Sequence, residues 1–188
     1  GADDVLIAEV SSFQLETAGD FHPSAAAMLN LTPDHLDRHG TMEAYAGLKR
    51  RLFARMEPAD LAVLNLDDPL VRAMQEGIRA RVAWFSSTEA VHEGSFLRDG
   101  WICVRFHGEE KRVCEAKDLR IPGRHNLENA LAAAALSAGM GVPSAVVAYA
   151  LRHFEGVEHR IEFSGVRAGV RYYNDSKGTN PDSTEKAV

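Results

Sequence analysis

The sequence contains only two cysteines, no long apolar run and no excess of positive charge. Two cysteines cannot build a disulfide framework, so we expect a fold that depends on a packed core and a protein of the reducing cytoplasm. A membrane-spanning helix needs a run of roughly 18 or more apolar residues, and none occurs. A formal net charge of −6 argues against a general nucleic-acid-binding protein, whose surface is normally basic.

The two cysteines, Cys103 and Cys114, lie symmetrically about Gly108-Glu109. We expect this dipeptide to form a two-residue hairpin turn, in which case the cysteines could face each other across a strand pair. The preferred interpretation is that both are reduced thiols packed as small apolar side chains.

The remaining composition is typical of a globular domain with one sizeable core: 188 residues, of which 45% are hydrophobic and 26% charged. The first half alternates short apolar runs with amphipathic segments. This alternation predicts an α/β fold with a mainly parallel central sheet flanked by helices. The predicted strands are 4–10, 25–31, 61–66 and 82–85, and the predicted helices start at Thr32-Pro33, at Thr41 and at Asp68, the last ending at Gly77.

The second half carries a different pattern. Residues 95–119 alternate short strands with tight turns at Asp99-Gly100 and Gly108-Glu109, which predicts a small antiparallel sub-sheet. The predicted helices are 123–138, where alanine is abundant, and 143–153, and a predicted closing hairpin pairs 161–166 with 170–174 around Ala168-Gly169.

Glu9 ends the first apolar run and is followed by Ser11 and Gln14. In open α/β sheets ligands bind beyond the carboxyl ends of the strands, where a carboxylate can hold Mg²⁺ beside nucleotide phosphates. Ser11 and Gln14 add neutral hydrogen-bonding groups at the same place. A glutamate that is only structural or solvated is an equally weighted alternative.

A dense set of histidines and aspartates follows the second predicted strand: Asp34, His35, Asp37 and His39. On its own this set suggests a metal site, and it makes a metal-dependent hydrolase the main alternative function. No third ligand pattern follows the two histidines downstream. A polar helix start with capping acids is the structural alternative.

Lys49 lies on a predicted helix face that is otherwise partly apolar. A lysine in such a position usually extends its ammonium group to solvent. If the amine is buried instead, its pKa falls, and the neutral form can react with CO₂ to give a carbamate, an anion suited to Mg²⁺.

Three further segments carry polar groups suited to a nucleotide. Asn126 and Asn129 share one helix face and could recognise an adenine edge, although Asn126 could instead cap the helix. Arg160 could clamp phosphate oxygens or form a surface ion pair. Asp175 and Lys177 follow the last predicted strand and could contact ribose and phosphoryl groups, or form a plain polar turn.

The order of these segments resembles the central domain of the Mur ligase family of ATP-dependent amide ligases. The motifs that carry the resemblance cover nearly the whole chain: residues 9–16 (EVSSFQLE), 30–39 (NLTPDHLDRH), Lys49, 123–130 (GRHNLENA), 158–160 (EHR) and 174–180 (NDSKGTN). The sequence of residues 11–16 is similar to the corresponding motif of the branch that adds D-glutamate to UDP-N-acetylmuramoyl-L-alanine. Other branches and folylpolyglutamate-type ligases differ there.

The resemblance implies a role for each candidate residue. Glu9 would bind the Mg²⁺ that bridges the ATP phosphates, and His35 with a carbamylated Lys49 would hold a second Mg²⁺. The other implied roles are substrate contacts from Ser11, Gln14 and His35, an adenine site at Asn126 and Asn129, phosphate contacts from Arg160 and Lys177, a ribose contact from Asp175 and a nucleotide contact from Thr179. His35, Lys49, Arg160 and Lys177 would thus be the catalytic residues.

The implied reaction activates the L-alanyl carboxylate with ATP as an acyl phosphate, which the amine of D-glutamate then attacks. Residues 1–180 would form a P-loop-NTPase-like central ATP-binding domain, and 181–188 would lead into a C-terminal domain. The family's glycine-rich phosphate loop would precede Asp4 and does not occur in these 188 residues. We therefore expect a fragment that, by itself, neither forms the amide bond nor hydrolyses ATP at a useful rate. The expected partners are small molecules only, bound by a monomer.

Overall fold

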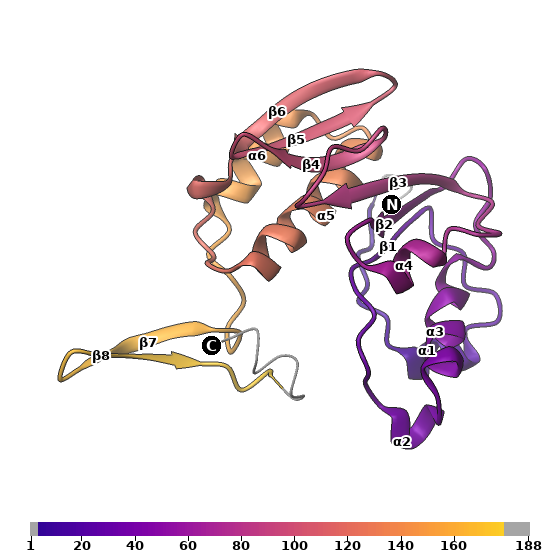
Figure 1. Cartoon of the computed structure of the whole chain (residues 1–188), viewed down its shortest axis with the longest axis horizontal. Coiled ribbons are helices and arrows are strands. Elements are labelled where there is room, and N and C mark those ends of the chain that lie inside the picture. Colours follow the sequence, from indigo (N-terminus) through magenta and orange to yellow (C-terminus); the bar gives the residue numbers. More distant parts are fainter. Residues whose placement is uncertain (1–3, 179–188) are drawn as a thin grey trace.

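A computed structural model of the chain describes residues 4–178. Its centre is a six-stranded sheet with the strand order β1-β2-β3-β4-β5-β6 (Figure 1). Strands β1 to β4 run parallel, whereas β4, β5 and β6 are antiparallel neighbours. The strands are β1 (Ala25–Met28), β2 (Leu61–Asn65), β3 (Arg81–Ser86), β4 (Gly94–Arg98), β5 (Trp101–Phe106) and β6 (Glu109–Glu115).

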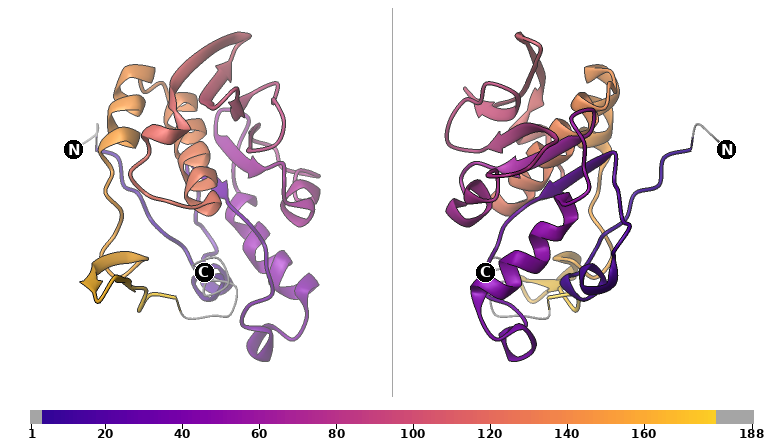
Figure 2. Two further views of the ribbon diagram at one scale, coloured as in Figure 1. Left: turned by 60° about the vertical axis from the view of Figure 1, so that its left-hand side comes forward. Right: turned by 90° about the vertical axis from the view of Figure 1, so that its right-hand side faces the viewer.

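Helices cover both faces of this sheet and make three layers, as Figures 1 and 2 show. On one face α5 (Arg124–Gly139) packs along the sheet, and α6 (Ser144–His153) packs on α5 and β6. The other face carries α3 (Met42–Arg50), the 3₁₀ turn η1 (Arg51–Phe53) and α4 (Pro69–Ala73). The shorter elements are α1 (Ser12–Thr17) and α2 (Leu36–His39), which contact α3, and the 3₁₀ turn η2 (Ala116–Asp118). The predicted α/β fold is confirmed.

Strand β2 shows how the core is divided between the two faces. All five of its residues are buried. Because side chains alternate along a strand, Leu61 and Val63 pack with α5 and α6, whereas Ala62 and Leu64 pack with α3, η1 and α4. This double burial explains why the segment is a continuous apolar run in the sequence.

Two of the predicted helix starts are confirmed by their caps. The Thr41 hydroxyl accepts a hydrogen bond from the Ala44 backbone N–H at 3.1 Å. The Asp68 carboxylate accepts from the N–H groups of Leu70 and Val71 at 2.9 and 3.0 Å, and Pro69 occupies the first helical position. Helix α4 is shorter than predicted, because it ends at Ala73.

The helix predicted to open at Thr32-Pro33 is wrong. Residues 32–35 are not helical, and His35 adopts a left-handed conformation with φ 51° directly before α2. A residue in that conformation cannot continue a right-handed helix, so only the short helix from Leu36 to His39 forms after it.

The strand predicted at 4–10 does not form. This segment has no strand pairing, and Val5, Leu6 and Ile7 are 84%, 92% and 90% exposed. Among residues 4–178, β1 pairs with β2 alone and so leaves its other edge open. An apolar run identifies a segment suited to a sheet, but a strand also needs a hydrogen-bonding neighbour.

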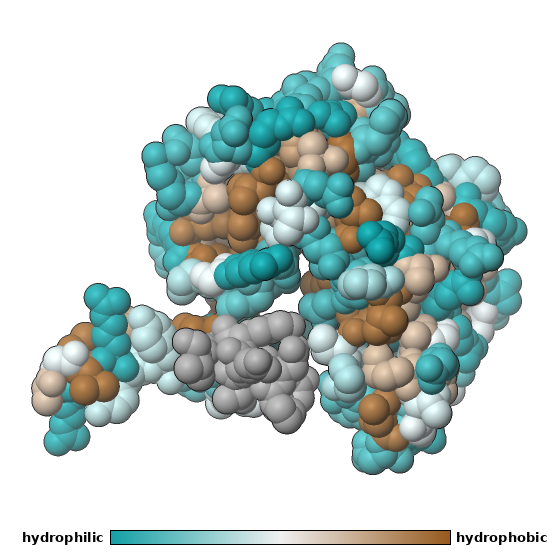
Figure 3. All heavy atoms as spheres, in the orientation of Figure 1, coloured by the Kyte–Doolittle hydropathy of each residue, from teal (hydrophilic) through white to brown (hydrophobic). Residues whose placement is uncertain are grey.

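The predicted antiparallel strands between 95 and 119 are confirmed, but they extend the parallel sheet through the β3–β4 pairing. The separate small sheet is the hairpin of β7 (Glu162–Arg167) and β8 (Val170–Asn174), which confirms the predicted turn at Ala168-Gly169. Within the described residues this hairpin packs extensively on no other helix or strand. Figure 3 shows apolar residues on its surface, where Phe163, Val166, Val170, Tyr172 and Tyr173 are exposed.

The two cysteines do not face each other across the strand pair, which was the less favoured of the two interpretations. The hairpin turn lies one residue earlier than predicted, at His107-Gly108, and the register shifts between Ile102 and Cys103. Cys103 therefore pairs with Arg112, and the two thiols lie in separate core clusters. Both are free and buried, as the preferred interpretation had it, and burial raises the pKa of each thiol.

No helix within residues 4–178 is long and apolar enough to cross a bilayer.

Gly94, at the start of β4, gives a test of the β3–β4 junction. Its φ is +125°, and an added Cβ would lie 1.8 Å from the Trp84 carbonyl oxygen. We expect Gly94→Ala to lower the free energy of unfolding by about 3 kcal/mol or more, because backbone strain and overpacking act together. Gly100→Ala is the matched control, since its φ is +78° but an added Cβ meets nothing within 4 Å. Equal midpoints of urea unfolding for the two variants would contradict the close approach of Gly94 to the Trp84 backbone.

Candidate functional site

The first candidate segment, directly after Glu9, is shaped by a capping box at the start of α1. The Ser11 hydroxyl accepts from the Gln14 backbone N–H at 3.3 Å, and the Gln14 side-chain oxygen accepts from the Ser11 backbone N–H at 2.8 Å. Both predicted substrate-contacting side chains thus hold each other at the helix start. They remain exposed, so the same groups face solvent beside Glu9.

His35 stands at the start of α2 with its side chain 48% exposed. Its Nε2 lies 3.6 Å from the Asp34 carboxylate, and its ring meets Phe13 of α1 in an edge-to-face arrangement with centroids 5.0 Å apart. The left-handed backbone at His35 turns the chain between Asp34 and α2. The imidazole is therefore held between a carboxylate and an aromatic ring and keeps one side open to solvent.

Lys49, in the last turn of α3, is partly buried. Burial lowers the pKa of its amine below the ordinary lysine value, while the negative charges of Asp34 and Glu9 act in the opposite direction. These couplings place Asp34 and Glu9 in the electrostatic neighbourhood of the amine. The Lys49 nitrogen also lies 5.8 Å from the ring centroid of Tyr45, whose own pKa is raised by burial and by Asp34.

The structure gives no support to the metal-dependent hydrolase. The His39 side chain is 1% exposed, with Nε2 3.0 Å from the Ser12 hydroxyl and Nδ1 3.7 Å from Glu16. It is enclosed in the helix packing, whereas His35 lies open to solvent. Within residues 4–178, no three histidine, cysteine, aspartate or glutamate side chains gather into a metal-binding group.

The predicted adenine-binding residues lie on the first two turns of α5. Gly123, and not Asn126, occupies the N-cap position of α5. The Asn126 side-chain amide instead donates to the Pro122 carbonyl at 2.6 Å. Asn129 is exposed on the following turn. The helix start is thus stabilised locally, and an amide remains available on its surface.

A polar network around Asp67, close to the start of α5, was not predicted from the sequence. Burial acts to raise the pKa of Asp67, but hydrogen bonds from Ser86, Thr88 and Ser87 prevail and lower it. The carboxylate accepts from these three hydroxyls at 2.6–3.0 Å. Ser87 in turn lies 3.5 Å from the Arg124 guanidinium at the start of α5. Only the carboxyl-end position of Asp67 after β2 could have indicated this role.

The last group of predicted site residues lies on or beside the β7–β8 hairpin. Asp175 accepts from the Ile161 backbone N–H at 3.1 Å, and the Lys177 backbone N–H donates to the His159 carbonyl at 3.1 Å. These bonds join the two ends of the hairpin beside Arg160, which is exposed. Thr179 lies outside the described residues.

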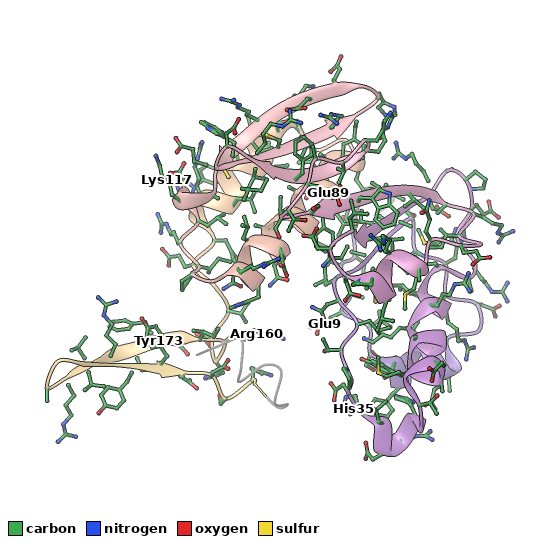
Figure 4. The ribbon with its side chains drawn as sticks, in the orientation of Figure 1. Glu9, His35, Glu89, Lys117, Arg160 and Tyr173 are labelled. Atoms are coloured by element: carbon green, nitrogen blue, oxygen red, sulfur yellow. The ribbon has the colours of Figure 1, made fainter. Side chains whose placement is uncertain are left out.

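The structure therefore groups the predicted residues into three sets. Glu9, Asp34 and Lys49 interact electrostatically, with His35 beside Asp34. The asparagines of α5 form a second set, and the hairpin residues form a third. In the view of Figure 4, Glu9 and His35 lie along the side of the N-terminal half that faces the hairpin and Arg160.

Comparison with known proteins identifies the family to which the chain is similar. The family described as the Mur ligase middle domain matches residues 2–137. The UDP-N-acetylmuramoylalanine–D-glutamate ligase of Pelotomaculum thermopropionicum is 53% identical over 188 residues, which are 100% of this chain and 41% of that protein. The enzyme of the same name from Alkaliphilus oremlandii is 48% identical over 187 residues, again 100% and 41%. The chain thus spans about two fifths of the length of these relatives.

Solved structures show the same fold. MurF from Acinetobacter baumannii superposes with a TM-score of 0.67 at 22% identity, over 87% of this chain and 36% of that one. MurC from Thermotoga maritima superposes with a TM-score of 0.62 at 23% identity, over 93% and 38%. Identities this low carry an argument about architecture only.

The surroundings of Lys49 generate a titration prediction. We expect its amine to titrate below that of Lys117, and Asp34→Asn to lower its pKa further, because an anion that favours the ammonium form is lost. The measurement is the pH dependence of isotope-labelled lysine side-chain NMR signals.

Lys117 serves as the internal control for this titration. Its pKa is raised by a hydrogen bond to, and the charge of, Glu115, so Glu115→Gln should lower it and leave Lys49 unchanged. A Lys49 pKa that rises or stays constant in Asp34→Asn would contradict the assignment.

Proposed function

This chain belongs to the Mur ligase family, and we propose that it is the ATP-handling part of an amide ligase that adds D-glutamate to UDP-N-acetylmuramoyl-L-alanine in peptidoglycan synthesis. The relatives that span the whole chain at 53% and 48% identity carry the name of that activity. The structural observation that supports the proposal is the partly buried Lys49 amine, whose pKa burial lowers and the charges of Asp34 and Glu9 act to raise. In this proposal residues 1–180 are the central ATP-binding domain and 181–188 lead into the next domain.

In this proposal Glu9, His35 and Lys49 supply the protein ligands of two magnesium ions. Mg²⁺ prefers oxygen ligands and retains several waters, and Glu9 offers an exposed carboxylate for an ion on the ATP phosphates. His35 offers an exposed imidazole beside Asp34. Because burial favours the neutral form of the Lys49 amine, that amine can add to CO₂ and lose a proton, which leaves a carbamate with two oxygens. When bound, the metal ions would supply charge stabilisation to the transferring phosphoryl group.

The nucleotide would lie between the second and third sets of residues. Asn126 and Asn129 offer amide donors and acceptors to the adenine edge from the start of α5. Arg160 and Lys177 provide cations for the phosphates, Asp175 an acceptor for a ribose hydroxyl, and Thr179 a further nucleotide contact. The Asp67 network holds the loop after β3 and, through Ser87, the start of α5.

The chemistry proceeds in two steps in this proposal. The L-alanyl carboxylate attacks the γ-phosphorus of ATP, which gives an acyl phosphate and ADP. The amine of D-glutamate then attacks the acyl carbon, loses a proton, and phosphate leaves from the tetrahedral intermediate. His35, Lys49, Arg160 and Lys177 would act on the charge that gathers at the phosphoryl group, while Ser11, Gln14 and His35 would orient the UDP-muramoyl substrate.

The location and assembly belong to the same proposal. We propose that the protein acts on its small-molecule substrates in the cytoplasm, as a monomer. The 188 residues alone are proposed to be inactive, and every activity test below uses the full-length protein that contains this chain.

The test is phosphate release from ATP. We expect release to require both UDP-N-acetylmuramoyl-L-alanine and D-glutamate, and Glu9→Gln to lower kcat by about 10²-fold or more, because one charge-stabilising ligand is lost. Glu109→Gln is the matched control, since Glu109 lies on β6 and is 74% exposed beside Lys111. Phosphate release that does not depend on D-glutamate, or equal activity of the two variants, would contradict the proposal.

A further inference from the structure

His39 occupies an enclosed position between three helices. Its side chain is 1% exposed, its ring stacks on Tyr45 of α3 with centroids 5.5 Å apart, and Phe13 of α1 lies 5.3 Å away on centroids. Nε2 lies 3.0 Å from the hydroxyl of Ser12, which is itself only 2% exposed. His39 belongs to α2, so one imidazole contacts both α1 and α3.

The same helices position two residues of the site, His35 directly before α2 and Lys49 on α3. Phe13, which contacts His39, also meets the ring of His35 at 5.0 Å. Tyr45, on the other side of His39, lies 5.8 Å from the Lys49 nitrogen. The rings of His35, Phe13, His39 and Tyr45 thus form a continuous row that ends at Lys49, with His39 in its interior.

A second set of contacts fixes α1 against its neighbours. Glu16 at the end of α1 lies 3.7 Å from Nδ1 of His39 and forms an ion pair with Arg38 at 2.8 Å. The Arg51 guanidinium donates to the Glu16 backbone carbonyl at 2.9 Å. The imidazole therefore combines a stacked contact with Tyr45, a tilted contact with Phe13 and a polar group near each nitrogen.

We propose that His39 is a positioning residue, which sets the relative placement of Ser11 and Gln14 on α1, His35 before α2 and Lys49 on α3. The inference rests on the proposed function, because it assigns these groups to one substrate and metal site. An apolar side chain of similar size would fill the space, but it would leave the buried Ser12 hydroxyl without this partner. Small displacements of reacting groups have large effects on rate.

The experiment compares steady-state kinetics of the full-length protein and its variants. We expect His39→Ala to raise the KM for the UDP-muramoyl substrate at least about 10-fold and to lower kcat, with the KM for ATP changed less than about 2-fold. His39→Phe keeps the stacking but loses the contact with Ser12, so it should fall between wild type and His39→Ala. Ser12→Ala should act in the same direction as His39→Phe, and it covers the case in which His39→Ala does not fold.

His153→Ala is the matched control, because His153 also stacks on a tyrosine, Tyr149, but on α6. It should leave both KM values unchanged. A role confined to stability would reduce the fraction of active enzyme and leave the KM values of the remainder unchanged in every variant, which would overturn the inference alone. A wild-type protein without phosphate release that depends on both substrates would overturn the proposed function, and with it this inference.

Discussion

The amine of Lys49 and the two carboxylates near it form the interaction on which the functional account depends. Packing of α3 removes part of the water around the amine and favours its neutral form, while Asp34 and Glu9 favour the charged form. Conversion of this amine to a carbamate would replace a cation by an anion at the same place. The positive charge that now offsets Asp34 and Glu9 would thereby be lost, and bound cations would be needed to balance the three negative charges. In this account CO₂ addition and magnesium binding are therefore coupled.

The fold places these groups through the ends of its segments. Glu9 precedes α1, Asp34 follows β1 along the chain, and Lys49 lies at the end of α3, which packs on the same face of the sheet as α4. None of these side chains belongs to the apolar core. The core fixes the positions of the helices, and short polar contacts such as the capping box of α1 then orient the segment ends.

Much of the fold could be predicted because its signals are local. The alternation of buried runs and capped helices identified β2, β3 and the helix starting at Thr41, and the turn residues identified the β7–β8 hairpin. Three features depended on information that a sequence pattern does not carry. A strand at 4–10 requires a neighbouring strand, the left-handed His35 depends on how Asp34 and α2 are held, and the bulge after Ile102 moves Cys103 and Cys114 to separate clusters.

The candidate site likewise has residues that the sequence could identify and properties that required the structure. Glu9, His35 and Lys49 could be selected from motif order, but the burial of Lys49 and its coupling to Asp34 required coordinates. His39 illustrates the opposite case, because its residue type suggested a metal ligand whereas its position shows a side chain enclosed by Phe13 and Tyr45. Residue type indicates which chemistry is available, and packing decides whether a group is free to use it.

Carbon-13 NMR of the full-length protein in labelled bicarbonate with magnesium at neutral pH would detect a carbamate on Lys49 directly. We expect a carbamate resonance that is absent from Lys49→Arg and retained in Lys117→Arg, whose lysine is exposed. A wild-type protein without a carbamate resonance, or a resonance that survives Lys49→Arg, would contradict this expectation.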